Sequence, residues 1–132
     1  MLVDPLRLED CCLISDGGGA YVMTSVDRAR DCPKPPVQVA GVGEAVSHSG
    51  THWSQQSAFT STPQAYCSPY AFERAGIAPE DVDVLTLYDP FTIVALMQIE
   101  DMGFCEKGEG GTFVEGNRLH FDGGGLPYNT HG

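Results

Sequence analysis

The clearest alternation of apolar and polar positions lies in the second half of the chain. Residues 82–87 are rich in Val and Leu and predict a short strand, which ends at Tyr88. Asp89 is a favourable helix N-cap, and Pro90 suits the first helical position because its missing N–H needs no partner there. Gly103 predicts the end of this helix. The pattern therefore predicts a strand that leads directly into a helix.

The predicted helix is apolar around most of its circumference, which is typical of a buried helix rather than a surface helix. Its apolar residues are Phe91, Val94, Ala95, Leu96, Met97, Ile99 and Met102. The strand before it places Tyr88 and Asp89 at the edge of a buried α/β layer. Ligands of open α/β folds usually bind at that edge.

A second helix is predicted before this strand. Thr62 is a favourable N-cap, and Pro63 suits the first helical position. Gly76 predicts that the helix ends after Ala75. The residues expected to be buried on this helix are Ala65, Tyr66, Tyr70, Ala71 and Phe72. The order helix, strand, helix predicts an α/β architecture.

The first half of the chain carries weaker strand patterns. Residues 20–23 and 37–42 are both predicted strands, and the second alternates with a period of two. Gly41 and Gly43 indicate a bend or the close crossing of another backbone. The glycine triplet at 17–19 favours a tight turn over a phosphate-binding loop, because no Lys-Ser/Thr pair follows it.

Local patterns also predict a few short elements. Residues 25–30 predict one helical turn that begins at a serine or an aspartate. Residues 112–114 and 118–121 predict the two strands of a hairpin that turns through a glycine. Both elements are expected to lie outside the central helix–strand–helix unit.

The polar stretch 47–62 is long for a connection, and long loops in compact domains often carry function. His48 and His52 stand four residues apart, but the glycine and serines between them disfavour the helix that would align them on a metal. We therefore predict no metal site here. The loop is expected to line a substrate entrance or to meet another subunit.

Composition narrows the classes of function. The chain has 132 residues, 42% of them hydrophobic, which suits a single domain with a real core. Its net charge of −11 argues against nucleic-acid binding and against anionic membrane surfaces. No apolar run approaches the ~20 residues of a membrane span, and charged residues interrupt any signal-peptide pattern near the N-terminus. The five cysteines lack C-x-x-C spacing, so free thiols in the cytoplasm are expected.

Five short motifs, taken in order, resemble the C-terminal half of the thiolase superfamily, and most closely its lipid-transfer-protein or sterol-carrier-protein-x thiolase-like branch. They are Asp10-Cys11-Cys12 with Ser15-Asp16-Gly17-Gly18-Gly19-Ala20, the 75–83 segment, Tyr88-Asp89-Pro90-Phe91-Thr92, Gly103-Phe104-Cys105 with Gly108-Glu109-Gly110-Gly111, and Pro127-Tyr128-Asn129-Thr130-His131-Gly132. Together they span nearly the whole chain.

The resemblance implies half of a five-layered αβαβα fold, with a mixed sheet and a buried helix, that normally forms a homodimer. Residues 1–132 would be a thiolase-like C-terminal domain, truncated at its C-terminus and without the N-terminal half. Coenzyme A thioesters are the implied substrates, with no bound cofactor. Family members use a nucleophilic Cys from the N-terminal half, and a His and a second Cys from the C-terminal half. The family's Gly-His-Pro motif lies beyond Gly132, so the motif's histidine is not His131.

One departure from the family concerns the site itself. The Asn-Glu-Ala-Phe motif of typical thiolases is Tyr88-Asp89-Pro90-Phe91 here, so the water-holding asparagine is replaced by tyrosine. A sub-branch of the family resembles aldolases that cleave coenzyme A-linked steroid side chains. There, tyrosines perform acid–base chemistry and a zinc-ribbon/OB-fold partner completes the complex. This resemblance implies catalytic roles for Tyr88 and Tyr128, and substrate binding by Asp89, Asn129 and His131.

Three functions stay open on the sequence. The chain is part of a thiolase-like acyltransferase, part of a thiolase-fold aldolase that acts on an acyl-coenzyme A, or a non-catalytic binding subunit or remnant. Because most of the family's site lies on residues outside this chain, the isolated chain is expected to be inactive.

Overall fold

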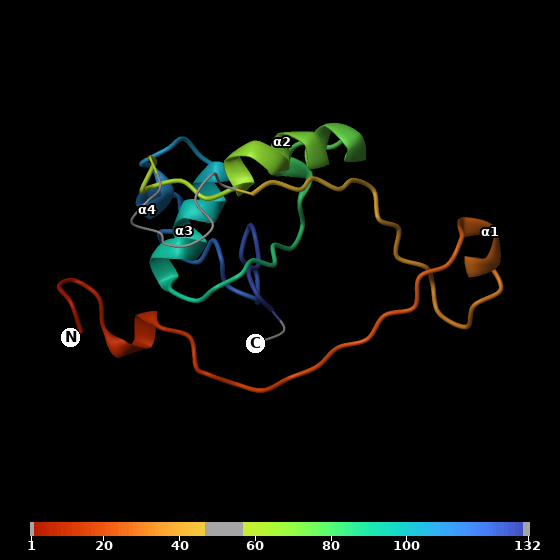
Figure 1. Ribbon diagram of the computed structural model, residues 1–132, viewed down its shortest axis with the longest axis horizontal. Coiled ribbons are helices and arrows are strands. Elements are labelled where there is room, and N and C mark those ends of the chain that lie inside the picture. Colours follow the sequence, from red (N-terminus) through yellow and green to blue (C-terminus); the bar gives the residue numbers. More distant parts are fainter. Residues whose placement is uncertain (1, 47–56, 131–132) are drawn as a thin grey trace.

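The computed structural model describes residues 2–46 and 57–130. Its helical elements, in chain order, are η1 (Leu8–Asp10), α1 (Val26–Ala29), α2 (Gln64–Ala75), η3 (Pro79–Asp81), α3 (Thr92–Asp101) and α4 (Gly110–Phe113). Helices α2, α3 and α4 lie together with the C-terminal segment, whereas the chain around α1 forms a wide loop that leaves this body and returns to it (Figure 1). The helical turn predicted for residues 25–30 is confirmed as α1.

Helix α2 agrees with the predicted second helix to within one residue, but the prediction that Thr62 caps it is wrong: the N-cap is Pro63, and the Thr62 hydroxyl donates to the Asp101 carboxylate at 2.9 Å. The helix begins after Pro63 and ends at Gly76, whose φ of 68° is the left-handed conformation expected of a C-cap glycine. The Gly76 N–H donates to the carbonyl oxygen of Phe72 at 2.9 Å. The prediction that Tyr66 and Tyr70 are buried is wrong, because their exposed fractions are 62% and 61%.

Two glycines let an extended segment lie directly on α2. A Cβ atom added at Gly41 would collide with the carbonyl oxygen of Ala71, and one at Gly43 would collide with that of Cys67. Ala71 and Cys67 are one helical turn apart, so the two glycines follow the helix face step by step. The Arg74 guanidinium also donates to the Val42 carbonyl oxygen at 2.9 Å. The predicted close crossing of another backbone is confirmed.

Helix α3 begins later than predicted. Its N-cap is Phe91, so the prediction that Asp89 caps the helix is wrong; the Asp89 carboxylate instead accepts hydrogen bonds from the C-terminal segment. The end of the helix is confirmed, since Gly103 follows it with a φ of 84°. Ile99 of α3 is 1% exposed and forms the core together with Leu85 and Leu126.

The predicted hairpin over residues 112–121 is wrong. Its first strand falls in the single-turn helix α4, where Gly110 packs against Leu96 and Glu100 of α3. The Gly110 N–H donates to the Glu100 carboxylate at 3.0 Å. The local sequence pattern does not predict this contact with α3, which stabilises a helical turn where a strand was expected.

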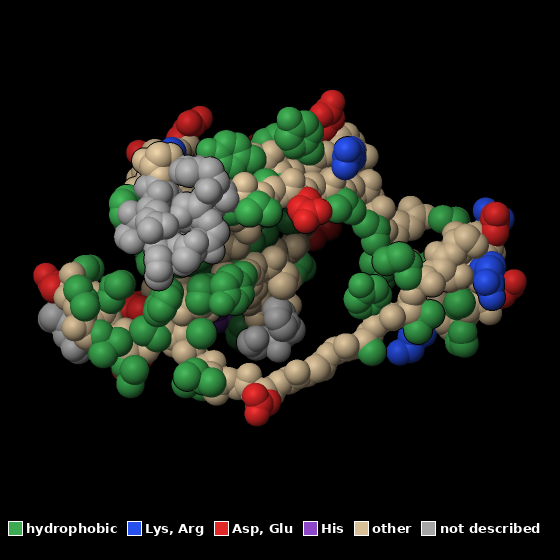
Figure 2. All heavy atoms as spheres, in the orientation of Figure 1, with side chains coloured by type: hydrophobic (Ala, Val, Ile, Leu, Met, Phe, Trp, Pro, Cys, Tyr) green, Lys and Arg blue, Asp and Glu red, His purple; other side chains and the backbone are tan. Residues whose placement is uncertain are grey.

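The extended segments do not assemble into a regular sheet within residues 2–46 and 57–130. The predicted strand at 82–87 makes one parallel bridge, between Leu85 and Tyr128. The segments predicted as strands at 20–23 and 37–42 are extended, and the glycine triplet between 16 and 20 makes no turn. Many large hydrophobic side chains of this loop lie on the surface (Figure 2). The mixed sheet therefore stays a prediction.

Candidate functional site

The turn between residue 88 and helix α3 is where segments from both ends of the chain meet. On one side, Cys11 forms an antiparallel bridge with Phe91, and the Cys12 N–H donates to the Pro90 carbonyl oxygen at 3.0 Å. The Thr92 hydroxyl donates to the Asp10 carboxylate at 2.8 Å. The N-terminal motif of the sequence thus fixes the end of this turn nearest to α3.

On the other side, the C-terminal segment runs parallel to residues 85–87. The Leu85 N–H donates to the Pro127 carbonyl oxygen and the Asn129 N–H donates to the Leu85 carbonyl oxygen, both at 2.9 Å. The side chain of Asn129 then replaces the next backbone unit: its Oδ1 accepts from the Leu87 N–H at 2.9 Å, and its Nδ2 donates to the Leu87 carbonyl oxygen at 3.3 Å. Asn129 has a φ of 43°, a conformation that asparagine tolerates better than most residues.

This pairing brings Tyr128 against Asp89. The Tyr128 hydroxyl donates a hydrogen bond to Oδ2 of Asp89, and the Asn129 side chain donates to the same oxygen at 3.4 Å. Burial raises the pKa of Tyr128 well above its ordinary value, and the hydrogen bond to Asp89 and the negative charge of Asp89 raise it further. The phenol is therefore held protonated at neutral pH, as a proton donor beside a carboxylate.

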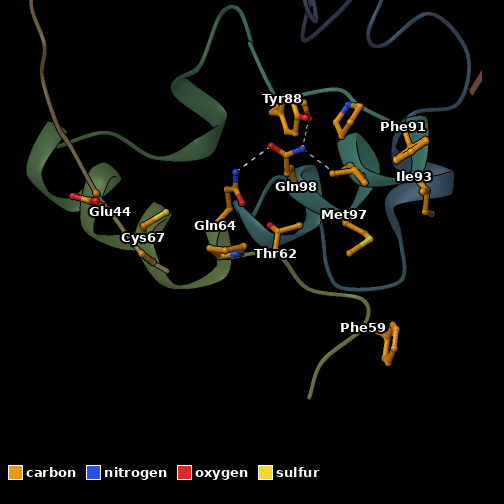
Figure 3. A pocket seen from close by; sticks show the side chains of 15 residues that line it. Glu44, Phe59, Thr62, Gln64, Cys67, Tyr88, Phe91, Ile93, Met97 and Gln98 are labelled. Carbon is orange, nitrogen blue, oxygen red and sulfur yellow. Dashed lines mark hydrogen bonds between the residues drawn. The ribbon is translucent and has the colours of Figure 1, made fainter. Parts of the chain in front are cut away.

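Tyr88 and Tyr128 line different cavities. Tyr128 and Asp89 line a cavity of about 340 Å³ whose other walls are mostly apolar residues of α3 and of the loops beside it. Tyr88 lines a larger cavity of about 910 Å³ between α2, α3 and residues 43–45 (Figure 3). The Tyr88 side chain is 75% exposed. The structure thus brings Asp89, Tyr128 and Asn129 together and leaves Tyr88 apart from them.

Three histidines named in the sequence analysis cannot be placed in the site. His131, predicted to bind substrate, lies outside the described residues, as do His48 and His52 of the polar loop. Within the described ranges, no group of three or more His, Cys, Asp or Glu side chains is arranged to hold a metal ion. The same part of the chain contains no helix with the length and apolar composition needed to cross a bilayer.

Gln98 is a site residue that the sequence analysis missed. It is 2% exposed, and its Nε2 donates to the Tyr88 carbonyl oxygen at 2.6 Å and to the Val94 carbonyl oxygen at 3.1 Å. Its Oε1 accepts from Nε2 of Gln64 on α2 at 3.1 Å (Figure 3). The available signal was a lone amide within an otherwise apolar run, since such a residue needs hydrogen-bond partners when buried.

Comparison with known proteins finds a matching family model and similar proteins that cover nearly the whole chain. Residues 43–132 match the family model described as thiolase C-terminal domain-like. The chain is 38% identical over 134 residues to the steroid side-chain-cleaving aldolase of Thermomonospora curvata, covering 99% of this chain and 34% of that protein. It is 35% identical over 132 residues to an acetyl-CoA acetyltransferase of Methanothermobacter thermautotrophicus, covering 100% of this chain and 34% of that protein.

Among solved structures, the chain is similar to that of an Ltp2-ChsH2(DUF35) aldolase, with a TM-score of 0.85 and 38% identity. This match covers 99% of the present chain and 35% of the solved chain. The chain thus spans about a third of the length of the relatives that it matches. On the match to residues 43–132, which is more than half of its length, the chain belongs to the thiolase C-terminal domain-like family.

Proposed function

We propose that this chain is the C-terminal part of a thiolase-fold enzyme that cleaves a carbon–carbon bond of a coenzyme A thioester by a retro-aldol reaction. The observation that carries the proposal is the Tyr128–Asp89 pair, which combines a protonated phenol with a carboxylate at the wall of an apolar cavity. Cleavage by this route needs an acid and a base, and it needs no acyl-enzyme thiol.

In the proposed mechanism, the substrate is a thioester with a hydroxyl group on its β-carbon. The Asp89 carboxylate accepts the hydroxyl proton, the β-carbon becomes a carbonyl, and the bond between the α- and β-carbons breaks. The electron pair of that bond forms an enolate of the thioester, which takes a proton from the Tyr128 hydroxyl at its α-carbon. Transfer of the proton from Asp89 to the Tyr128 phenolate restores the pair, so the protons balance.

Asp89 and Asn129, which the sequence predicts as substrate-binding residues, take other roles in the proposal, Asp89 as the base and Asn129 as its support. Asn129 holds the Asp89 oxygen that faces Tyr128, and it pairs with the backbone of Leu87. Tyr88 is proposed as an alternative catalytic phenol, since its exposed side chain lines the larger cavity, but the proton transfers described above do not use it. His131 stays a proposed substrate-binding residue.

A second candidate is acyl transfer through a thiol, which the 35% identity to an acetyl-CoA acetyltransferase favours. That reaction requires a readily ionised cysteine. Burial raises the pKa of Cys105, and the negative charges of Glu100, Glu109 and Glu106 raise it further. These effects disfavour Cys105 as the nucleophilic thiolate of such a reaction.

The proposal extends to the surroundings of the site. We propose that the extended segments at 13–24 and 37–46 join a mixed sheet with the rest of a longer thiolase-fold chain, and that two such chains form a homodimer in the cytoplasm. A zinc-ribbon/OB-fold protein is the proposed partner, a choice supported by the second protein named in the Ltp2-ChsH2(DUF35) structure. Coenzyme A enters as part of the substrate, without a bound cofactor.

The test compares single variants of the full-length protein on a β-hydroxyacyl-coenzyme A. We expect Tyr128→Phe to lower kcat by about 10²-fold or more, the usual scale for a general acid or base. Tyr66→Phe is the matched control, because Tyr66 is an exposed phenol on α2. The isolated 132-residue chain should give no turnover. An unchanged kcat in the Tyr128→Phe variant would remove this residue from the mechanism.

A further inference from the structure

The backbone that carries Asp89 belongs to neither a helix nor a regular strand. Its position therefore depends on a few individual contacts. Asn129 holds the residue that precedes Tyr88, and Cys12 and Cys11 hold the residues that follow Asp89. Between these two anchor points, the Tyr88 carbonyl accepts a hydrogen bond from Gln98 at 2.6 Å, which fixes the peptide unit that joins Tyr88 to Asp89.

Gln98 is built into the interior as a complete hydrogen-bonding unit. An amide group has two N–H donors, and the structure uses both, one on Tyr88 and one on Val94. Its oxygen accepts from Gln64 in the first turn of α2. At 2% exposure, Gln98 is shielded from bulk solvent, so an apolar residue in its place removes the donor that the Tyr88 carbonyl oxygen has here.

Gln98 also links the larger cavity to the backbone that carries Asp89. It lines the larger cavity, together with Gln64 and Tyr88. The peptide that it holds leads to Asp89, which lines the smaller cavity and accepts the hydrogen bond of Tyr128. A displacement of that peptide would therefore move the carboxylate away from the phenol, although Gln98 touches neither group of the pair.

We propose that Gln98 is a positioning residue for the acid–base pair of Asp89 and Tyr128, acting through the Tyr88 carbonyl. This inference rests on the proposed function for its relevance to catalysis, but not for its test. Removing the amide lets the turn shift, lengthens the contact between carboxylate and phenol, and makes the phenol easier to ionise. Asp89 is the charged group that faces the Tyr128 hydroxyl.

The test follows the ionisation of Tyr128 in the 132-residue chain by NMR of ¹³C-labelled tyrosine, with the Tyr128→Phe variant used to assign the signal. Gln98→Met keeps the length and apolar body of the side chain and removes its amide. We expect Tyr128 to ionise at least about one pH unit lower in this variant than in the parent, a tenfold change in its ionisation equilibrium. Gln64→Met is the control, because it breaks one contact of Gln98 and leaves the bond to Tyr88 in place.

A shortened amide separates positioning from loss of fold. Gln98→Asn keeps both donors but draws them back from Tyr88, so it should lower the pH of ionisation by less than Gln98→Met, and it replaces that variant if Gln98→Met does not fold. Equal ionisation of Tyr128 in the parent and in the folded Gln98 variant would overturn the inference. So would an equal shift in Gln64→Met, since that would indicate general loosening.

The full-length protein provides a second readout. A positioning role predicts a lower kcat with little change in KM for Gln98→Met, whereas the loss of a substrate contact would raise KM. If the Tyr128 ionisation shifts but kcat does not, the positioning role stands and the proposed function fails. If neither quantity changes, the inference itself fails.

Discussion

Asp89 has two chemical uses open to it, and the choice depends on residues far away in sequence. Followed by proline and a helix, its carboxylate is well placed to cap the helix N-terminus, as the local pattern predicts. In the structure the carboxylate instead accepts hydrogen bonds from Tyr128 and Asn129, about 40 residues later in the chain. The parallel bridge at Leu85 helps to bring these residues to it. A capping role is local and can be read from sequence, whereas this pairing requires the tertiary fold.

The Tyr128–Asp89 pair predicts a specific dependence of stability on pH. Because the folded state raises the pKa of Tyr128, the contribution of its neutral phenol is fully present below the ordinary tyrosine pKa of about 10. It is lost as pH rises through the higher folded value, since the unfolded chain then binds fewer protons than the folded chain. We expect the parent chain to lose more thermal stability than Tyr128→Phe between about pH 9 and about pH 11. Thermal melts followed by circular dichroism across this range provide the measurement, and parallel curves would contradict the assigned contact.

At the scale of the elements, the ends of the helices are better determined by sequence than the strands are. Pro63, Gly76 and Gly103 act on the backbone next to them, so the limits that they predict agree with α2 and with the end of α3. Helix α4 depends on the fit of Gly110 against Leu96 and Glu100, which is a contact between elements. The hairpin prediction failed there because a strand pattern carries no information about what packs against it.

The crossing of residues 41–43 over α2 predicts a strong difference between glycines. We expect Gly43→Ala to destabilise the chain by about 1–3 kcal/mol, because its Cβ meets the Cys67 backbone, which cannot move aside as a flexible side chain would. Gly17→Ala is the matched control: nothing lies within 4 Å of its added Cβ, so its effect should stay within about 0.5 kcal/mol. Chemical denaturation of both variants gives the comparison. Equal stabilities would mean that the segment does not lie against α2.

At the scale of the whole molecule, many of the exposed apolar side chains lie between residues 13 and 46, a stretch that includes the segments predicted as strands at 20–23 and 37–42. Ile14, Val22 and Val37 have exposed fractions of 105%, 94% and 96%. The pattern of these segments is that of strands, but within the described residues they pair with no other strand. The sequence therefore predicts which segments suit a strand. If the proposed mixed sheet is correct, the strands that pair with them belong to a part of the protein outside residues 1–132.

Limited proteolysis tests that sheet directly. In the isolated chain we expect trypsin to cut first after Arg28 and Arg30, because both side chains are exposed on the wide loop around α1. Arg74 should be cut later, since it lies within α2 and donates to the Val42 carbonyl. In the full-length protein, pairing of the flanking segments 13–24 and 37–46 would hold the loop at both ends. Cleavage at these two arginines should then slow by about tenfold or more. That factor corresponds to a local opening that costs about 1.4 kcal/mol or more before the protease can cut. Mass spectrometry of the early fragments identifies the cut sites. Equal rates in the isolated chain and in the full-length protein would rule out the sheet, because paired strands on both sides of the loop would restrict its access to the protease.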